Sequence, residues 1–197
     1  MIRFRTSLRT SLRAFAKDES GILLAETLIF MPLLVWGFLA LVVYWDVFRT
    51  INVTQKAAYS IADLLSRQAV VNMQFINGLD KVLKFLTPGA PDSKMLITSL
   101  EYNGTTKKYK LLFSRSPNGK AIPRTEASIQ ALKPMLPTLA DLESVIIVET
   151  WVNYEPDFDT GVLNFAPGVK NQTFSQFIVT RPRNWRRVCL DGTSTCS

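Results

Sequence analysis

The longest run of apolar side chains lies near the N-terminus. Residues 27–45 contain no charged side chain, and the apolar segment begins at residue 22, interrupted only by Glu26. At 1.5 Å per residue, a helix over 22–45 is about 36 Å long, which exceeds the roughly 30 Å hydrocarbon core of a bilayer. Trp45 ends the run, where an aromatic ring favours the membrane interface. The pattern predicts a transmembrane helix over residues 22–45.

After this run the chain shows helical spacing of apolar positions and then strand-like alternation. The first helix is predicted to continue through residues 46–69, and a second helix is predicted at 71–86. Alternation and β-branched residues predict strands at 96–102, 109–113, 145–154 and 174–180, with a short helix at 125–132. We therefore expect an α+β fold. It has a long N-terminal transmembrane helix extended outside the membrane, a second helix, and a small, mainly antiparallel sheet of about four strands.

Charge sets the predicted orientation of the transmembrane helix. The net charge of +7 is unevenly spread, because residues 1–17 carry Arg3, Arg5, Arg9, Arg13 and Lys17 and no acidic side chain. Basic residues stay on the cytoplasmic side of a membrane. The chain then divides into a basic cytoplasmic leader (1–21), the transmembrane helix (22–45) and an extracytoplasmic α+β domain (46–197). A cleaved secretory signal is the competing interpretation, but its apolar core is normally shorter than this one.

The composition argues against an enzyme. The chain has no histidine, the commonest general base and metal ligand. We also find no glycine-rich phosphate-binding loop, and we expect no cofactor and no metal. The segment 157–161 (DFDTG) resembles part of a calcium loop but lacks the remaining ligands. Four acidic residues are candidates for a hydrolytic pair of carboxylates, but their spacing does not distinguish them from ordinary charges at strand edges. They are Glu149, Glu155, Asp157 and Asp159.

Two further features lie near the C-terminus. A basic segment contains Trp185 among the arginines Arg181, Arg183, Arg186 and Arg187. Because the predicted topology places it outside the cytoplasm, we expect a solvated or subunit-contacting segment and no nucleic-acid partner. Cys189 and Cys196 are the only cysteines. They are either a disulfide or two free thiols, and an oxidising compartment would favour the disulfide.

Glu26 needs a physical explanation because a carboxylate near the centre of a bilayer costs up to about 3 kcal/mol. One explanation is that Glu26 lies close enough to the cytoplasmic interface to reach water. The other is that its carboxylate pairs with a cation that a partner supplies within the membrane.

The segment around Glu26 resembles a known family. Residues 15–26 (FAKDESGILLAE) resemble the start of type IV pilin-like precursors, in which a peptidase cuts after a glycine and a glutamate becomes the fifth residue of the mature chain. The continuation 26–34 (ETLIFMPLL) is similar to the TadE/TadG-like pilus assembly proteins, which carry a glutamate, a few apolar residues and then a proline. Thr27 departs from the pattern, since many relatives have an aromatic or aliphatic residue there. The outline of the rest, including the Arg-Pro-Arg segment 181–183, also resembles the family.

The resemblance implies a function and its residues. A prepilin peptidase would cut between Gly21 and Ile22, and Glu26 and Pro32 would act in assembly. The partners would be other pilin-like subunits and the platform proteins of a tight-adherence (Flp-type) pilus or a related secretion system. The chain would be a minor pseudopilin of the bacterial inner membrane, with its domain in the periplasm. Whether the subunit enters the filament or stays in the membrane is open.

Two other functions remain alternatives. Residues 1–17 are rich in Arg and Ser and contain no acid, which also describes a mitochondrial transit peptide. The chain would then be a structural subunit of the inner mitochondrial membrane. A signal-anchored ligand-binding module is the third possibility, and it would require a pocket with converging polar groups.

Overall fold

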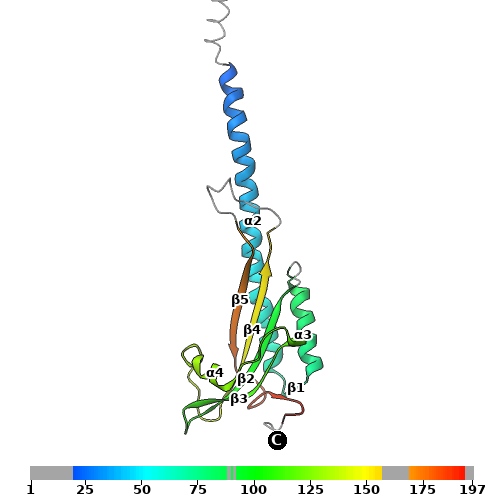
Figure 1. Cartoon of the computed structure of the whole chain (residues 1–197), viewed down its shortest axis with the longest axis vertical. Helices are drawn as coiled ribbons and strands as arrows, with labels where there is room; N and C mark the ends of the chain where they lie inside the picture. Colours follow the sequence, from blue (N-terminus) through cyan, green and yellow to red (C-terminus); the bar gives the residue numbers. More distant parts are fainter. Residues whose placement is uncertain (1–19, 88–89, 91, 157–168, 194–197) are drawn as a thin grey trace, which may run out of the picture.

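One long helix and a small α+β domain make up the computed structural model, which describes residues 20–87, 90, 92–156 and 169–193. The helices are α2 (Ser20–Ser66), α3 (Met73–Leu86) and α4 (Glu126–Ala131), with short 3₁₀ turns η1 (Pro117–Gly119) and η2 (Lys133–Met135). The strands are β1 (Val70–Val71), β2 (Lys94–Asn103), β3 (Lys108–Arg115), β4 (Ser144–Tyr154), β5 (Gln172–Thr180) and β6 (Cys189–Leu190). Figure 1 shows the first half of α2 projecting away from the sheet.

The predicted fold class is confirmed. Four strands form an antiparallel sheet in the order β3-β2-β4-β5, and each predicted strand is present with its ends shifted by a few residues at most. The second helix begins at Met73, two residues later than predicted, because Asn72 caps it: the Asn72 side chain accepts a hydrogen bond from the backbone N–H of Phe75 at 2.8 Å.

The first helix has 47 residues and two different surfaces. Its first half is apolar on every side and largely exposed, although Val43 is buried. In its second half the buried side chains recur three and four residues apart, at Ala57, Ala58, Ile61, Ala62 and Leu65. This stripe packs against β4 and β5, and the small alanines allow a close approach of helix and sheet. The helix is therefore membrane-like at one end and a core helix at the other.

The sheet is covered on both faces. Ile146 and Val148 of β4 lie in the core formed with α2 and α3, whereas Val145 and Ile147 lie in a second core with Ile129 of α4. Successive side chains of a strand point to opposite faces. Because both faces are buried, residues 145–148 of β4 form a continuous apolar run where a half-buried strand would alternate.

The segment after β5 turns back to the end of α2. The backbone N–H of Arg183 donates to the Ser66 carbonyl at 2.8 Å, which satisfies one of the carbonyls left free at a helix C-terminus. Farther along, β6 pairs in parallel with β1, so that Val70 lies opposite Cys189. The sequence did not predict this two-stranded sheet, since each strand has only two residues and no alternation to recognise.

Candidate functional site

The two residues of the predicted cleavage site lie in the first turn of α2. Gly21 and Ile22 are exposed, and a Cβ atom added at Gly21 would meet nothing within 4 Å. Gly21 is helical here, whereas the backbone at a cleaved bond must be extended to enter a protease. Cleavage at this bond therefore requires the helix to unwind locally at Gly21.

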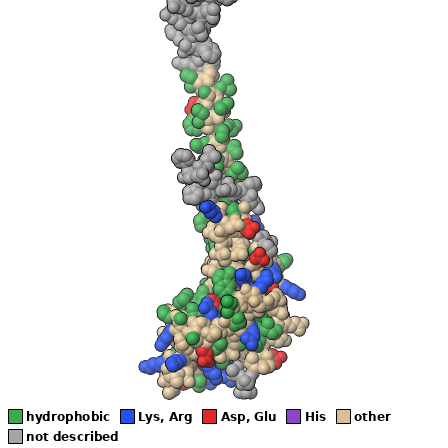
Figure 2. All heavy atoms as spheres, viewed as in Figure 1, with side chains coloured by type: hydrophobic (Ala, Val, Ile, Leu, Met, Phe, Trp, Pro, Cys, Tyr) green, Lys and Arg blue, Asp and Glu red, His purple; other side chains and the backbone are tan. Residues whose placement is uncertain are grey.

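Glu26 is exposed and lies on the otherwise apolar part of α2. Figure 2 shows the hydrophobic side chains along this part of the helix. Within the described residues it forms no ion pair or hydrogen bond. It lies one helical turn after Ile22, about 6 Å along the axis, and helical side chains tilt toward the N-terminus. An amine created at Ile22 would thus be near Glu26 of its own chain. Because the carboxylate is exposed, it is also accessible to the amine of a neighbouring chain.

The polar and helix-breaking residues near Glu26 are accommodated in the helix. The Thr27 hydroxyl donates to the Leu23 carbonyl at 2.7 Å, so this departure from the family pattern adds no unpaired hydroxyl to the apolar surface. The helix continues through Pro32 without ending. Since proline has no N–H, the carbonyl of Leu28 loses its usual donor four residues on.

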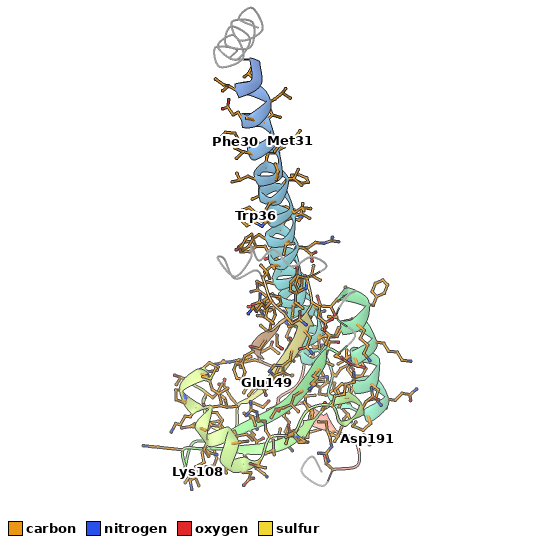
Figure 3. The ribbon with its side chains drawn as sticks, turned by 45° about the horizontal axis from the view of Figure 1, so that its top comes forward. Phe30, Met31, Trp36, Lys108, Glu149 and Asp191 are labelled. Atoms are coloured by element: carbon orange, nitrogen blue, oxygen red, sulfur yellow. The ribbon has the colours of Figure 1, made fainter. Side chains whose placement is uncertain are left out.

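The surface around these residues consists of large apolar side chains. Phe30, Met31 and Trp36 project outward from α2 in Figure 3. The structure does not bring Gly21, Glu26 or Pro32 to any part of the described domain, and this half of α2 lies beyond the sheet (Figure 1). The site is therefore a helix surface rather than a pocket.

The structure describes one of the two cysteines of the predicted disulfide. Cys189 is buried in β6 and takes part in a disulfide bond. Cys196 lies outside the described residues. The pairing of Cys189 with Cys196 stays a prediction.

The candidate carboxylates have different surroundings. Glu149, whose side chain is 6% exposed, accepts two hydrogen bonds from Arg124, at 2.6 Å from Nη2 and 3.1 Å from Nε. These hydrogen bonds raise the pKa of Arg124, although burial partly opposes them. Glu155 follows β4 and lies beside α2. Asp157, Asp159 and the rest of the calcium-like segment 157–161 lie outside the described residues. Glu149 thus has a structural partner, and no carboxylate pair for hydrolysis is formed with Glu155.

The basic C-terminal segment is largely exposed, in agreement with the expected solvated segment, and it also contacts its own domain. Three of its arginines form ion pairs with acidic residues of α2, of β2 and of the segment before β4: Arg183 with Asp63 at 2.9 Å, Arg187 with Glu101 at 3.3 Å, and Arg181 with Glu143 at 3.5 Å. The fourth donates to a backbone carbonyl: Arg186 to Leu142 at 3.3 Å. The sequence could not show this because every partner is distant along the chain.

Sequence reasoning missed a cavity of about 340 Å³ at the junction of α2, α3 and the end of β4. Asp46 and Arg49 line it from α2, and Glu155 from the segment after β4. The sequence signal for this cavity was the position of Asp46 and Arg49 just after the apolar run.

Neither a metal site in the described residues nor a known relative indicates a role for the protein. Among residues 20–87, 90, 92–156 and 169–193, no group of three or more Cys, Asp and Glu side chains is placed to hold a metal ion. No known protein family matches the chain, and neither a curated protein nor a solved structure matches it.

Proposed function

We propose that this protein is a non-enzymatic, membrane-anchored subunit that takes part in the assembly of a tight-adherence pilus or a related secretion system. The observation that carries the proposal is Glu26, an exposed carboxylate without a partner on the apolar half of α2, placed five residues after Gly21. The resemblance of residues 15–34 to pilin-like precursors supplies the function. The predicted leader supplies the orientation.

The apolar half of α2 supports the anchoring part of the proposal. α2 is the one helix among the described residues that is long and apolar enough to cross a membrane. Its large side chains are exposed from Ile22 to Trp45 with few exceptions, for example Leu24 at 75% and Leu34 at 66%. A soluble monomer rarely exposes so large an apolar surface. Lipid, or the same helix of neighbouring subunits, would cover it.

The charge of Glu26 supports the assembly part. Leader removal after Gly21 would create an ammonium group at Ile22, and opposite charges attract far more strongly in an apolar medium than in water. An isolated carboxylate there is costly, so pairing with an amine removes a cost that membrane insertion alone would impose. The pairing also fixes how far one subunit can slide along its neighbour, because misaligned helices leave both charges unpaired.

Processing is tested by changing Gly21. Gly21→Leu should block the peptidase and leave the chain longer by its leader, as seen by mass spectrometry of the protein extracted from bacterial inner membranes. Gly37→Leu is the matched control, since Gly37 also lies in α2 and a Cβ there also meets nothing within 4 Å. If wild-type protein keeps its leader in a strain with an active prepilin peptidase, the processing part of the proposal fails.

Assembly is tested by changing Glu26. Glu26→Ala should leave a stable, inserted protein that no longer crosslinks to other pilus components through residues 22–34. Glu26→Gln keeps a polar side chain but removes the charge, and should be defective in the same way. Thr27→Ala is the control, because the Thr27 hydroxyl bonds only within its own helix. Normal pili from the Glu26→Ala strain would contradict the proposal.

A further inference from the structure

The cavity at the junction of helix and domain is lined by charged and polar side chains. Its charged residues are Asp46, Arg49 and Glu155, and its polar ones include Thr50 and Asn153; Val53, Leu86 and Ala90 add an apolar wall. At about 340 Å³ it has room for a small polar group. It therefore differs in kind from the exposed apolar surface that lies before it on the same helix.

The position of the cavity along α2 fixes its depth relative to a membrane. Asp46 directly follows the last apolar residue of the run, Trp45, and Arg49 lies four residues beyond it, about 6 Å along the helix axis. The polar layer on each side of a bilayer is roughly 5–8 Å thick, which is half the difference between the thickness of the whole bilayer and that of its hydrocarbon core. With residues 22–45 in the hydrocarbon, the cavity opens at the level of the lipid headgroups.

Arg49 has no partner within the part of the chain that the structure describes, unlike every other arginine there. Seven arginines bind a carboxylate or a backbone carbonyl: Arg67, Arg115, Arg124, Arg181, Arg183, Arg186 and Arg187. Asp46 lies three residues before Arg49 on the same helix, a spacing that permits an ion pair, yet the two do not pair. The guanidinium is thus available to an anion from outside the chain, and phosphate matches its paired N–H groups best.

The two carboxylates of the cavity define the other half of the ligand. Asp46 and Glu155 also have no partner among the described residues. Ionised carboxylates only accept hydrogen bonds, so their complement is a cation with N–H donors. A ligand that satisfies all three charged side chains carries a phosphate and a primary ammonium a short distance apart.

We propose that this cavity binds the headgroup of a phosphoethanolamine lipid in the leaflet next to the domain, with the phosphate on Arg49 and the ammonium on Asp46 and Glu155. A phosphocholine headgroup has no N–H to donate, and a phosphoglycerol headgroup brings no cation to the carboxylates. The inference rests on the membrane anchor of the proposed function but not on pilus assembly. Such a lipid would fix the height of the domain above the membrane.

Lipid retention by the full chain tests the inference. Protein in detergent micelles receives phosphoethanolamine, phosphocholine or phosphoglycerol lipids with identical acyl chains, and native mass spectrometry measures the bound lipid. We expect phosphoethanolamine to be retained about tenfold better than either of the others, the loss of one charged hydrogen-bonding group being worth at least that factor. Equal retention of the three lipids, or a preference for phosphoglycerol, would overturn the inference.

Variants separate the two halves of the headgroup. Arg49→Gln should abolish the retention, whereas Lys56→Gln, which removes the same charge from an exposed position of α2 outside the cavity, should not. The double variant Asp46→Asn with Glu155→Gln should bind phosphoethanolamine and phosphocholine lipids equally. If inorganic phosphate at equal concentration displaces the lipid, the cavity binds a free anion, and the proposal of a lipid headgroup is overturned.

Alkaline carbonate extraction of membranes distinguishes this inference from the proposed function. A chain that stays in the membrane but shows no phosphoethanolamine preference contradicts the headgroup site alone. A chain released by carbonate has no membrane anchor, and the proposed function fails with it.

Discussion

Both halves of α2 carry large apolar side chains, but these side chains have opposite surroundings. Leu65, near its end, is fully buried against the sheet, whereas Leu34, near its middle, is 66% exposed. The packed half buries one stripe and leaves Gln55, Lys56 and other polar residues on its outer side. The projecting half has no polar side. A helix that is apolar all round needs an apolar medium on every side, so the comparison indicates lipid or neighbouring apolar helices around one half and protein around the other.

The largest expected effect concerns the side of the membrane on which each half ends. A reporter that is active only outside the cytoplasm, fused after Ser197, should be fully active because the proposed orientation places the C-terminus there. Protease added to spheroplasts should remove the domain and leave the projecting half of α2 protected. A reporter that works only in the cytoplasm would reverse the proposed orientation.

The same substitution in each half should have different effects on the free energy of unfolding of the domain. Leu65→Ala removes a fully buried side chain from the core and should lower that free energy by about 2–5 kcal/mol. Leu34→Ala should leave it unchanged, because Leu34 lies on the projecting half. Denaturant unfolding in detergent, followed by circular dichroism, measures both. Equal losses would mean that the projecting half packs on the domain.

The disulfide should stabilise the C-terminal segment, which contacts the end of α2 and pairs with β1. β6 holds Cys189 beside β1, directly after the end of α2. If Cys189 pairs with Cys196, a short loop is closed, and Cys189→Ser should lower the free energy of unfolding by about 2 kcal/mol. Thiol labelling of the denatured, non-reduced protein should detect no free cysteine. Two reactive thiols per chain would disprove the pairing.

The smallest expected effect is at the surface ion pairs of Asp63. Its carboxylate contacts Arg67 of its own helix end and Arg183 of the C-terminal segment, each at 2.9 Å. Because these side chains are substantially exposed, Asp63→Asn should cost no more than about 1 kcal/mol of unfolding free energy. The loss should shrink in high salt, which screens exposed charges. A salt-independent loss would indicate a packing role for Asp63.

Elements with a strong local pattern were predicted well from the sequence. The 71–86 helix and the strands at 109–113 and 145–154 are confirmed to within a few residues, because apolar periodicity over such lengths depends on neighbouring side chains only. β1 and β6 were missed, since two residues each carry no period. The processing and assembly roles of Gly21 and Glu26 remain predictions, because both residues are exposed on a part of α2 that the rest of the described chain does not cover.

The sequence by itself determined that residues 22–45 form a helix suited to lipid, because an uninterrupted apolar run requires an apolar medium whatever the rest of the chain does. Only the tertiary structure decided that Arg124 pairs with Glu149, that the C-terminal arginines bind their own domain, and that Asp46, Arg49 and Glu155 line one cavity. These side chains meet across long stretches of chain. Charge pairs at such separations leave no pattern in a sequence, since their energy depends on the distance between atoms that only folding brings together.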